Sequence, residues 1–576
     1  MLHLSKPQKL IYDMEKYSGG AISVICGSML LRRKVNAADL QAAANELHRI
    51  NAALRTRIVE TDAGPMQIVE GYAPQGAKML RFSNKLELTR YAEAYAKEPL
   101  PLYGQLCEFT VVLLPEQSGL LVKLHHIISD AWTLALLGTQ CNAILRGETP
   151  SAYSYEDHLQ TEDTYLKSER CAKDRTFFLQ QFKKCEEVTY LSERQSNSVA
   201  ARRRTFEIDR EKTGQLVNYA KSHGASIFAL FMTAVAAYFS RVTQNTEKFY
   251  LGTAVLNRAG AKEKNTAGMF INMIPLLMEL ENGQTFSHNL EAVKATAFSA
   301  FRHQKFNYDD ILTAIRQEYG SGERLYDVMF SYQNATITGG VESIWYHCGA
   351  QIESLQIHID DRDNEDILCV HFDYQTEKFT EQEIEWMYAH MLNLLFDAIE
   401  HEQKKLVELE LFTAGEKRRL LHDFNDTAAD YPRDKCVHTL FEEQATRTPD
   451  KTAVVACDRT LTYRQLNEQA NRIAHGLIAH GVKPGDIVAF MLPRRSYLIA
   501  AMFGILKVGA AYLPIDPDYP QDRIDYMLED SRTAYFITEE NIHTLLANET
   551  TADPALPLYS DSLCYCIYTS GSTGKP

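Results

Sequence analysis

The feature that most restricts the fold is a change of pattern along the chain. Up to about residue 412, strand-like apolar runs such as residues 104–114 alternate with helix-like segments such as residues 38–49. Residues 413–436 are instead rich in charged and small polar side chains, and a second alternation follows them. A chain of 576 residues is also too long for a single hydrophobic core. We therefore expect α/β units joined by a linker that starts with a short helix.

The second alternation favours a sheet of its own. Residues 452–456 and 487–492 are strand-like, whereas residues 463–480 and 496–506 are helix-like. Alternation of this kind is typical of a largely parallel sheet. The stretch LCYCIY, which contains Cys564 and Cys566, is expected to be a further strand that runs into the glycine- and hydroxyl-rich end of the chain.

The charge balance and the apolar runs exclude several partner classes. The formal net charge is −15, without the clustered Lys and Arg of nucleic-acid-binding proteins. The one basic run, Arg202, Arg203 and Arg204, is short and is interpreted as a solvated face. Apolar runs such as residues 227–237 are too short to span a bilayer, and the N-terminal residues lack a signal-peptide core. We expect a cytoplasmic protein with no nucleic-acid partner and no membrane partner.

The cysteines indicate a reducing compartment. All 11 are scattered between Cys26 and Cys566, without a CxxC pair or the histidine partners of a zinc site. Reduced thiols fit this spacing best, and we expect no metal site.

Two adjacent histidines end a buried strand-like segment, LLVKLHHI, at His125 and His126. Successive side chains of a strand alternate between its faces, so only one of the two rings can act at a given site. The same alternation weakens a metal-site interpretation, because the rings diverge and no third ligand is near. For an ordinary pair of histidines, one packed ring and one exposed ring would be the simplest interpretation.

The longer string HHIISDAWT resembles the HHxxxDG active-site motif of condensation domains of nonribosomal peptide synthetases, which chloramphenicol-acetyltransferase-like acyltransferases share. A strand precedes the string, and a helix is expected to begin near Thr133. Further segments are similar to segments of this family, in matching order: LSKPQKLIY at 4–12, INAALRT at 50–56, GMFINMIP at 268–275, HQKFNYDDIL at 303–312 and YDVMFSYQN at 326–334. The resemblance thus extends over most of residues 1–412.

This resemblance implies an α/β fold of two chloramphenicol-acetyltransferase-like lobes with mixed sheets, arranged as a V. The lobes would cover about residues 1–173 and about residues 174–412. Donor and acceptor carrier proteins would dock at opposite ends of a tunnel and present thioesters on their phosphopantetheine arms. By the same resemblance, His126 is the catalytic residue, while His125 and Asp130 hold the local structure.

Two positions depart from the family pattern. The glycine of the motif is replaced by Ala131, and Leu277 stands where the family often has an arginine available to the motif aspartate. Asp130 therefore needs another partner, because a buried carboxylate left unpaired is costly. Arg258 in the segment LNRAG is the candidate. Trp132 lies two residues after Asp130, as in condensation domains rather than in epimerisation domains.

The chemistry requires only one imidazole. Aminolysis of a thioester is downhill, and it needs a neutral amine held close to the carbonyl carbon. An imidazole near its ordinary pKa can accept a proton or form a hydrogen bond to the tetrahedral intermediate. The sequence does not decide which of these His126 does. Ser129 lacks the GxSxG setting of a nucleophile.

Three functions are therefore held open. The leading hypothesis is an acyltransferase that forms an amide between a carrier-bound acyl or aminoacyl donor and a carrier-bound aminoacyl acceptor. Because LSKPQKLIY lies almost at Met1, the donor is expected to come from another protein's carrier or from an acyl-CoA. The acyl-CoA case would be a starter condensation domain that begins a lipopeptide. The third hypothesis is a non-catalytic scaffold that only recruits carriers. The sequence leaves the joined amino acids, the donor stereochemistry, the product and the oligomeric state open.

Residues 435–576, after a linker at 413–434, resemble the start of an amino-acid-activating adenylation domain. The similar segments are HTLFEEQATRTPDKTAV at 438–454, LTYRQLN at 461–467, LKVGAAYLPIDPDYP at 506–520 and YTSGSTGKP at 568–576. In the family, the amino-acid pocket, the adenine site, the magnesium ligand and the C-terminal subdomain lie further downstream. We therefore expect a truncated AMP-binding domain without adenylation activity, and ATP with Mg²⁺ as cofactors of the full-length domain only. No carrier-protein serine for phosphopantetheine is present.

The glycine- and hydroxyl-rich loop of this second domain is the candidate phosphate-binding segment. Its backbone amides and hydroxyls could surround phosphate oxygens, although it is not a Walker loop. The resemblance assigns the contact with the phosphates of ATP to Thr569, Ser570, Gly571, Ser572, Thr573, Gly574 and Lys575.

Overall fold

The computed structural model describes residues 1–18, 21–62, 64–320, 322, 324–333, 340–361 and 367–569. The chain divides into two compact units, Met1–Asp423 and Phe424–Pro576. Each unit has its own sheets and its own hydrophobic core. They are described separately.

The first lobe of the first unit is built on a five-stranded mixed sheet in the order β12-β2-β7-β6-β5. Four of its strands come from the first 125 residues, whereas β12 comes from far later in the chain and pairs antiparallel with β2. Only the β5–β6 pair is parallel. The strands are β2 (Val24–Leu31), β5 (Lys78–Arg81), β6 (Cys107–Leu113), β7 (Ser118–His125) and β12 (Val341–Tyr346).

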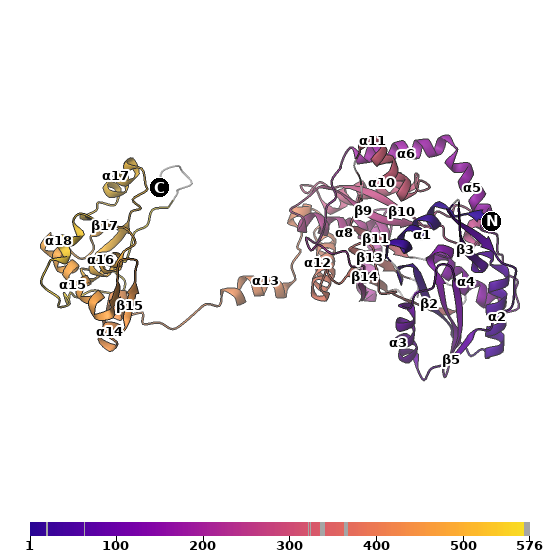
Figure 1. The fold of residues 1–576 in the computed structure, drawn as a ribbon, viewed down its shortest axis with the longest axis horizontal. Coiled ribbons are helices and arrows are strands. Elements are labelled where there is room, and N and C mark those ends of the chain that lie inside the picture. Colours follow the sequence, from indigo (N-terminus) through magenta and orange to yellow (C-terminus); the bar gives the residue numbers. More distant parts are fainter. Residues whose placement is uncertain are drawn as a thin grey trace. The chain divides into compact units, whose positions relative to one another are not determined.

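Helices cover both faces of this sheet. In Figure 1, α2 and α3 lie on opposite sides of β5. Leu40 and Leu47 of α2 pack with Val122, whereas Leu88 of α3 packs with Leu121, the neighbouring residue on β7. This alternation is the two-residue period of a strand buried on both faces. The other elements are α1 (Lys6–Ser18), α2 (Ala37–Ile50), α3 (Lys85–Ala96), α4 (Ala131–Ile144), α5 (Glu156–Leu166), the 3₁₀ turns η1 (Ala21–Ser23), η2 (Ala52–Arg55) and η3 (His126–Ile128), and a small sheet of β1 (Leu2–His3), β3 (Thr56–Thr61) and β4 (Gly64–Val69).

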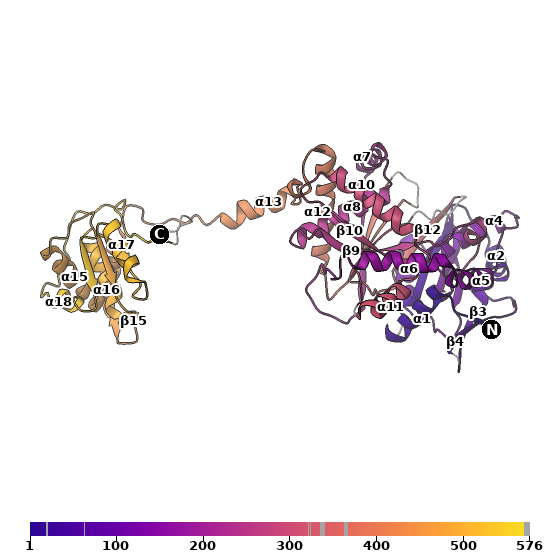
Figure 2. The same ribbon diagram turned by 90° about the horizontal axis from the view of Figure 1, so that it is seen from above.

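The second lobe is built on a six-stranded mixed sheet in the order β10-β9-β11-β13-β14-β8. In Figure 2, α7, α8 and α10 lie on one side of β9 and β10. The strands are β8 (Ala201–Ile208), β9 (Lys248–Val255), β10 (Asn272–Glu279), β11 (Val328–Gln333), β13 (Leu355–Asp360) and β14 (Leu368–Gln375). The helices are α6 (Glu169–Phe182), α7 (Arg210–Ser222), α8 (Ile227–Val242), α9 (Ala261–Lys264), α10 (Phe286–Phe301), α11 (Tyr308–Tyr319), α12 (Glu381–Glu400) and α13 (Ala414–Leu421), with the 3₁₀ turn η4 (Leu406–Glu408). A further 3₁₀ turn, η5 (Asp423–Asn425), spans the boundary between the two units.

The most apolar helix of this lobe, α8, lies in the lobe's core. Its residues from Ala229 to Ala237 are all buried, as expected for a helix that is hydrophobic on every side. Within the described residues, no single helix has the length and composition to cross a membrane. Among these residues, α7 and α8 have the required length and composition only when they are taken together, and the chain bends by 100° between them.

The second unit has a three-stranded parallel sheet in the order β18-β17-β19, with a separate hairpin of β15 and β16. Its strands are β15 (Thr452–Val455), β16 (Thr460–Thr462), β17 (Ile487–Met491), β18 (Ala511–Pro514) and β19 (Tyr535–Thr538). Its helices are α14 (Val437–Arg447), α15 (Tyr463–Ala479), α16 (Ser496–Lys507), α17 (Gln521–Asp530) and α18 (Ile542–Leu546). The mixed sheets of the first unit and the parallel sheet of the second confirm the predicted fold class.

Two details of the predicted lobes need correction. The boundary between residues 173 and 174 falls inside α6, whose Phe178 and Phe182 belong to the core of the second lobe. The second lobe therefore begins at α6. Conversely, β12 lies within the predicted second lobe but completes the sheet of the first.

The predicted strand near the end of the chain is wrong in extent. Only an isolated bridge joins Tyr565 to Tyr512 of β18, with hydrogen bonds from Cys566 N to Tyr512 O (2.9 Å) and from Tyr512 N to Cys564 O (3.2 Å). The neighbouring strand β18 ends at Pro514, which has no N–H to continue the ladder.

The basic run on β8 is also not a uniformly solvated face. Arg203 forms two 2.7 Å hydrogen bonds to the buried Asp373, and Arg204 pairs with Glu385 at 3.0 Å. Strand pairing places Arg203 directly opposite Asp373, which explains this ion pair.

Candidate active site

The histidine motif forms a tight turn between β7 and α4. The strand ends at His125, the 3₁₀ turn η3 starts at His126, and Asp130 caps the N-terminus of α4. His125 and Asp130 are completely buried, whereas His126 is partly exposed. The prediction that strand alternation separates the two rings assumed that both residues belong to the strand. The different environments arise instead because the chain leaves the strand between them.

His125 holds the turn together. Its Nδ1 accepts a hydrogen bond from Ile127 N (3.1 Å), and its carbonyl accepts one from Ser129 Oγ (2.9 Å). Burial, together with the adjacent His126, lowers the pKa of His125 to about 3. The ring is therefore neutral near pH 7 and acts as a structural acceptor.

His126 differs from its neighbour in being partly open to solvent. Its carbonyl accepts a hydrogen bond from Ser129 N (3.2 Å), which closes the turn. Its Nδ1 is buried and has no hydrogen-bond partner among the described residues. Burial lowers the pKa of His126, although Asp130 opposes this shift, so that the ring is neutral near pH 7. A neutral imidazole at this position can accept a proton.

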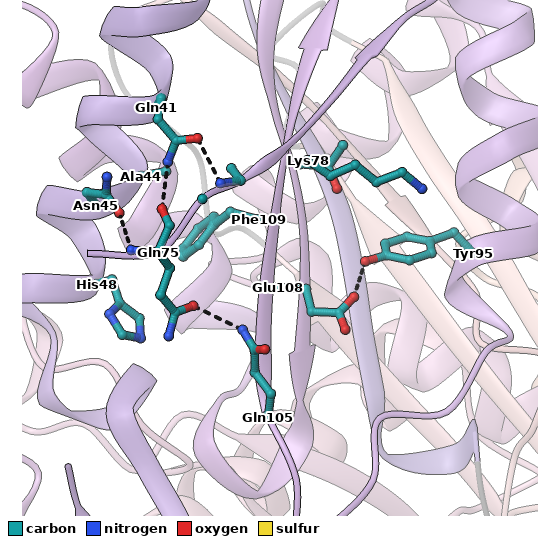
Figure 3. Close-up of a pocket in the computed structure, with 13 residues that line it drawn as sticks. Gln41, Ala44, Asn45, His48, Gln75, Lys78, Tyr95, Gln105, Glu108 and Phe109 are labelled. Carbon is teal, nitrogen blue, oxygen red and sulfur yellow. Dashed lines mark hydrogen bonds between the residues drawn. The ribbon is translucent and has the colours of Figure 1, made fainter. Parts of the chain in front are cut away.

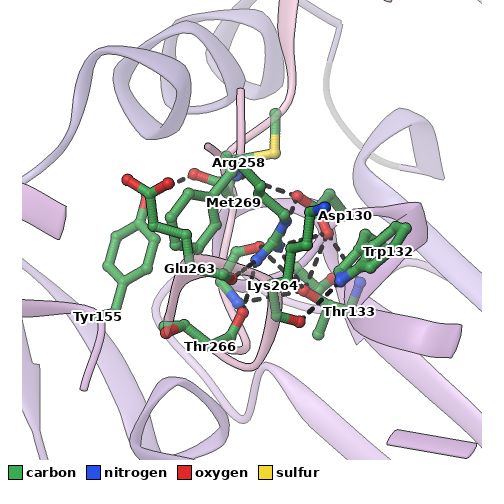
Figure 4. Close-up of polar contacts among 12 residues, drawn as sticks. Asp130, Trp132, Thr133, Tyr155, Arg258, Glu263, Lys264, Thr266 and Met269 are labelled. Carbon is green, nitrogen blue, oxygen red and sulfur yellow. Dashed lines mark hydrogen bonds and ion pairs between the residues drawn. The ribbon is translucent and has the colours of Figure 1, made fainter. Parts of the chain in front are cut away.

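Asp130 is the centre of a buried polar network (Figure 4). Its Oδ1 accepts hydrogen bonds from Thr133 N (2.8 Å) and Thr133 Oγ1 (2.9 Å), as an N-cap residue does. Its Oδ2 accepts one from Phe270 N (3.1 Å). Arg258 Nη2 lies 2.9 Å from both carboxylate oxygens, and both side chains are fully buried. The predicted pairing of Asp130 with Arg258 is therefore confirmed.

Arg258 connects this network to the second lobe. Its Nη1 donates to the carbonyls of Glu263 and Thr266 at 2.6 Å each, and its guanidinium lies 3.8 Å from the centre of the Phe270 ring. Leu277, at the position where the family often has an arginine, is buried in the apolar core of the second lobe. The ion pair thus joins the histidine turn of one lobe to the 258–270 segment of the other.

Two aromatic residues support the same junction, and sequence reasoning did not give them this role. Trp132 Nε1 donates to Lys264 O at 2.8 Å, and Tyr155 hydrogen-bonds through its hydroxyl to Met269 O. The Tyr155 ring lies so close to Gly268 that a Cβ there would be 2.1 Å from it. The glycine of the segment GMFIN is thus explained by the close approach of this ring.

Comparison with known proteins agrees with this geometry. The family model described as "Condensation domain" matches residues 1–421, which is well over half of the chain. The chain belongs to the condensation domain family. A second model, "AMP-binding enzyme", matches residues 441–576. The condensation domain is thus followed by part of an AMP-binding domain.

The curated relatives are much longer proteins. Surfactin synthase subunit 1 of Bacillus subtilis (strain 168) is 31% identical over 613 residues, a match that includes 100% of this chain and 17% of the relative. Bacitracin synthase 3 of Bacillus licheniformis is 30% identical, with 100% and 10% covered. The chain therefore spans less than a fifth of these relatives.

Solved structures share the fold of this condensation domain. A four-domain nonribosomal peptide synthetase bound to AMP and glycine aligns with 99% of this chain and 46% of its own, with a TM-score of 0.77 and 18% identity. The first condensation domain of the calcium-dependent antibiotic synthetase aligns with 72% of this chain and 99% of its own, with a TM-score of 0.64 and 20% identity. The starter condensation domain of rhizomide synthetase, in complex with C8-CoA, aligns with 71% of this chain and 98% of its own, with a TM-score of 0.63 and 20% identity.

The predicted phosphate loop cannot be placed in the same way. Thr569 is described, whereas Ser570, Gly571, Ser572, Thr573, Gly574 and Lys575 lie outside the described residues. Elsewhere in the described parts of the chain, no group of three or more His, Cys, Asp or Glu residues is arranged to hold a metal ion.

A cavity of about 200 Å³ lies away from the histidine turn of the condensation domain (Figure 3). Gln41 and Asn45 of α2 line one wall, and Glu108 of β6 lies across from them. Both α2 side chains hydrogen-bond to the backbone of Gln75, at 2.9 and 3.0 Å. These contacts fix the segment that leads into β5, and none of the motif residues lines the cavity.

Buried histidines should make the condensation domain sensitive to acid. Burial lowers the pKa to about 3 at His125, about 4 at His158 and about 4 at His347. An unfolded histidine binds a proton near pH 6.5, so the unfolded state gains protons first as the pH falls. Each group then lowers the free energy of unfolding by about 1.4 kcal/mol per pH unit below that value. At higher pH the contribution is constant.

Replacing one such histidine should make the free energy of unfolding less dependent on pH below about pH 6.5. The change in slope should correspond to up to one proton fewer taken up on unfolding. In His125→Asn, the side-chain oxygen can still accept the Ile127 N–H. Urea unfolding at several pH values measures the slope, and the exposed His288→Asn is the control. All three tryptophans, Trp132, Trp345 and Trp386, lie in the first unit, so tryptophan fluorescence reports its unfolding alone. An unchanged slope in His125→Asn would contradict the assignment of a neutral, buried ring.

Proposed function

We propose that the condensation domain joins a carrier-bound acyl or aminoacyl thioester to the amine of a carrier-bound aminoacyl acceptor. The observation that carries this proposal is the partly exposed, neutral imidazole of His126 at the junction of the two lobes. The match to the condensation domain family and the similarity to surfactin synthase subunit 1 and bacitracin synthase 3 support this proposal.

The reaction needs little beyond positioning and one proton acceptor. The acceptor nitrogen attacks the thioester carbon, the new C–N bond forms, and the C–S bond breaks to release a thiol. His126 takes the proton from the attacking amine, or hydrogen-bonds the intermediate, and the proton passes to the leaving sulfur. His125 keeps the turn in place, and the Asp130–Arg258 pair anchors it to the second lobe.

The partners follow from this chemistry. We propose that phosphopantetheine arms on donor and acceptor carrier proteins deliver the two thioesters. ATP and Mg²⁺ are proposed for a complete adenylation domain only, with the loop at residues 569–575 contacting the phosphates on sequence resemblance alone. The cytoplasm is the proposed compartment, because the scattered spacing of the cysteines, without a CxxC pair, fits reduced thiols.

A donor-competition assay tests the proposal. Acceptor carriers loaded with each of the twenty amino acids would be offered either an aminoacyl-loaded donor carrier or octanoyl-CoA. Intact-protein mass spectrometry then detects the amide on the acceptor. We expect product from the carrier-bound donor. Product from octanoyl-CoA alone would indicate a starter domain, and carrier binding without any product would indicate a scaffold.

A further inference from the structure

One backbone carbonyl of the histidine turn, that of Ile127, is held by a residue of α1 that lies far from the motif in the sequence. Within the turn, the carbonyls of His125 and His126 and the amide of Ile127 are held by neighbouring motif residues. The carbonyl of Ile127, a completely buried residue, is held instead by Gln8 of α1, whose Nε2 donates to it at 3.0 Å. Gln8 thus fixes the peptide group between Ile127 and Ile128, one residue after His126.

Gln8 is itself rigidly held. Its side chain is buried, and its Oε1 accepts hydrogen bonds from Ser5 N (2.9 Å) and from Gln67 Nε2 (2.9 Å). Its Nε2 also donates to Gln67 Oε1 at 3.1 Å, so that the two carboxamides form a reciprocal pair. Gln67, on β4, is buried and donates in addition to His3 O at 2.8 Å. The amide that contacts the turn therefore has one fixed orientation.

A carboxamide meets both requirements of this position. It must donate to the Ile127 carbonyl and accept from the Ser5 amide at the same time. A leucine would leave both backbone groups without this partner, and a carboxylate would place an acceptor against the Ile127 carbonyl. A protonated carboxylic acid, in contrast, has one donor and one acceptor.

We propose that Gln8 is a positioning residue for amide formation: through the Ile127 carbonyl it orients the imidazole of His126. This inference rests on the proposed condensation activity. A displacement of the imidazole ring by about 1 Å is enough to slow a reaction that depends on the position of the catalytic group relative to the substrates. Gln8 acts on the turn and does not touch the substrates.

The test compares two buried glutamines in the assay above. Gln140 of α4 matches Gln8, since its Nε2 donates to Ser151 O at 3.0 Å and its Oε1 accepts from Asn51 Nδ2 at 2.8 Å. Gln8→Leu and Gln140→Leu should both lower the urea midpoint. Only Gln8→Leu should lower kcat, by about 10- to 100-fold, with KM for both substrates unchanged. A kcat equal to that of Gln140→Leu would overturn the proposal.

Gln8→Glu gives a second, pH-dependent test that also applies if the leucine variant does not fold. Burial raises the pKa of a glutamate at this site, so its protonated form, which can donate to Ile127, increases as the pH falls. Its activity relative to the wild type should therefore rise from about pH 8.5 to about pH 6.5. A constant ratio would count against the proposal. His126→Ala is measured in parallel. Full activity of His126→Ala would overturn the condensation mechanism itself. If His126→Ala is inactive but Gln8→Leu has the kcat of the wild type, only the role of Gln8 is overturned.

Discussion

His126→Ala is expected to lower the rate of amide formation by about 100- to 10,000-fold, the range that one general acid–base group contributes. The free energy of unfolding should change by no more than about 1 kcal/mol, because the side chain is partly exposed and its Nδ1 has no partner among the described residues. Single-turnover rates with loaded carriers measure the first quantity, and urea unfolding followed by tryptophan fluorescence measures the second.

His125→Ala is the informative comparison for this prediction. It removes the acceptor of the Ile127 N–H inside a fully buried turn, so stability and activity should both fall. The exposed His288→Ala should change neither. An inactive but well-folded His125→Ala together with an active His126→Ala would show that the roles of the two histidines have been exchanged.

The local features of the site were predictable because they are encoded in neighbouring residues. The order of strand, aspartate and helix follows from the string HHIISDAWT, and the structure places β7 and α4 there, whereas the 3₁₀ turn η3 that starts at His126 was not predicted. The pairing of Asp130 with Arg258 was predicted by a physical requirement, since a buried carboxylate needs a partner and Leu277 cannot provide one. Segments such as 38–49, 463–480 and 487–492 followed from apolar periodicity and correspond to α2, α15 and β17.

Contacts between distant segments left no such signal. Gln8 contacts a carbonyl 119 residues away, and the Thr133 hydroxyl lies 2.9 Å from Gly268 O across 135 residues. Neither pairing produces a period or a motif in one sequence. The same holds for β12, which pairs with β2 although its composition resembles that of any other strand. The lobe boundary was misplaced for a related reason: α6 is a continuous helix, and only its packing assigns it to the second lobe.

Asp130→Ala is expected to be the most destabilising change in the condensation domain. It leaves the fully buried Arg258 guanidinium without its carboxylate, and it removes the N-cap of α4. Breaking a buried ion pair on one side costs about 3–5 kcal/mol, and loss of an N-cap costs about 1 kcal/mol. Activity should fall with stability, because the turn that carries His126 loses its connection to the second lobe. Unfolding in urea, followed by tryptophan fluorescence, measures the loss of stability.

A combined variant separates the effect of the ion pair from that of the cap. Arg258→Met alone leaves Asp130 buried, with hydrogen bonds from Thr133 and Phe270 only, and should also be strongly destabilising. Asp130→Asn combined with Arg258→Met retains a capping oxygen and removes both charges, so it should recover much of the lost stability. The ion pair between the histidine turn and the second lobe stays broken, so condensation should stay slow. The exposed pair of Lys262 and Asp157, 2.8 Å apart, is the control, and Asp157→Ala should cost no more than about 1 kcal/mol. If Asp130→Ala were as mild as this control, the buried pair would not be what joins the histidine turn to the second lobe.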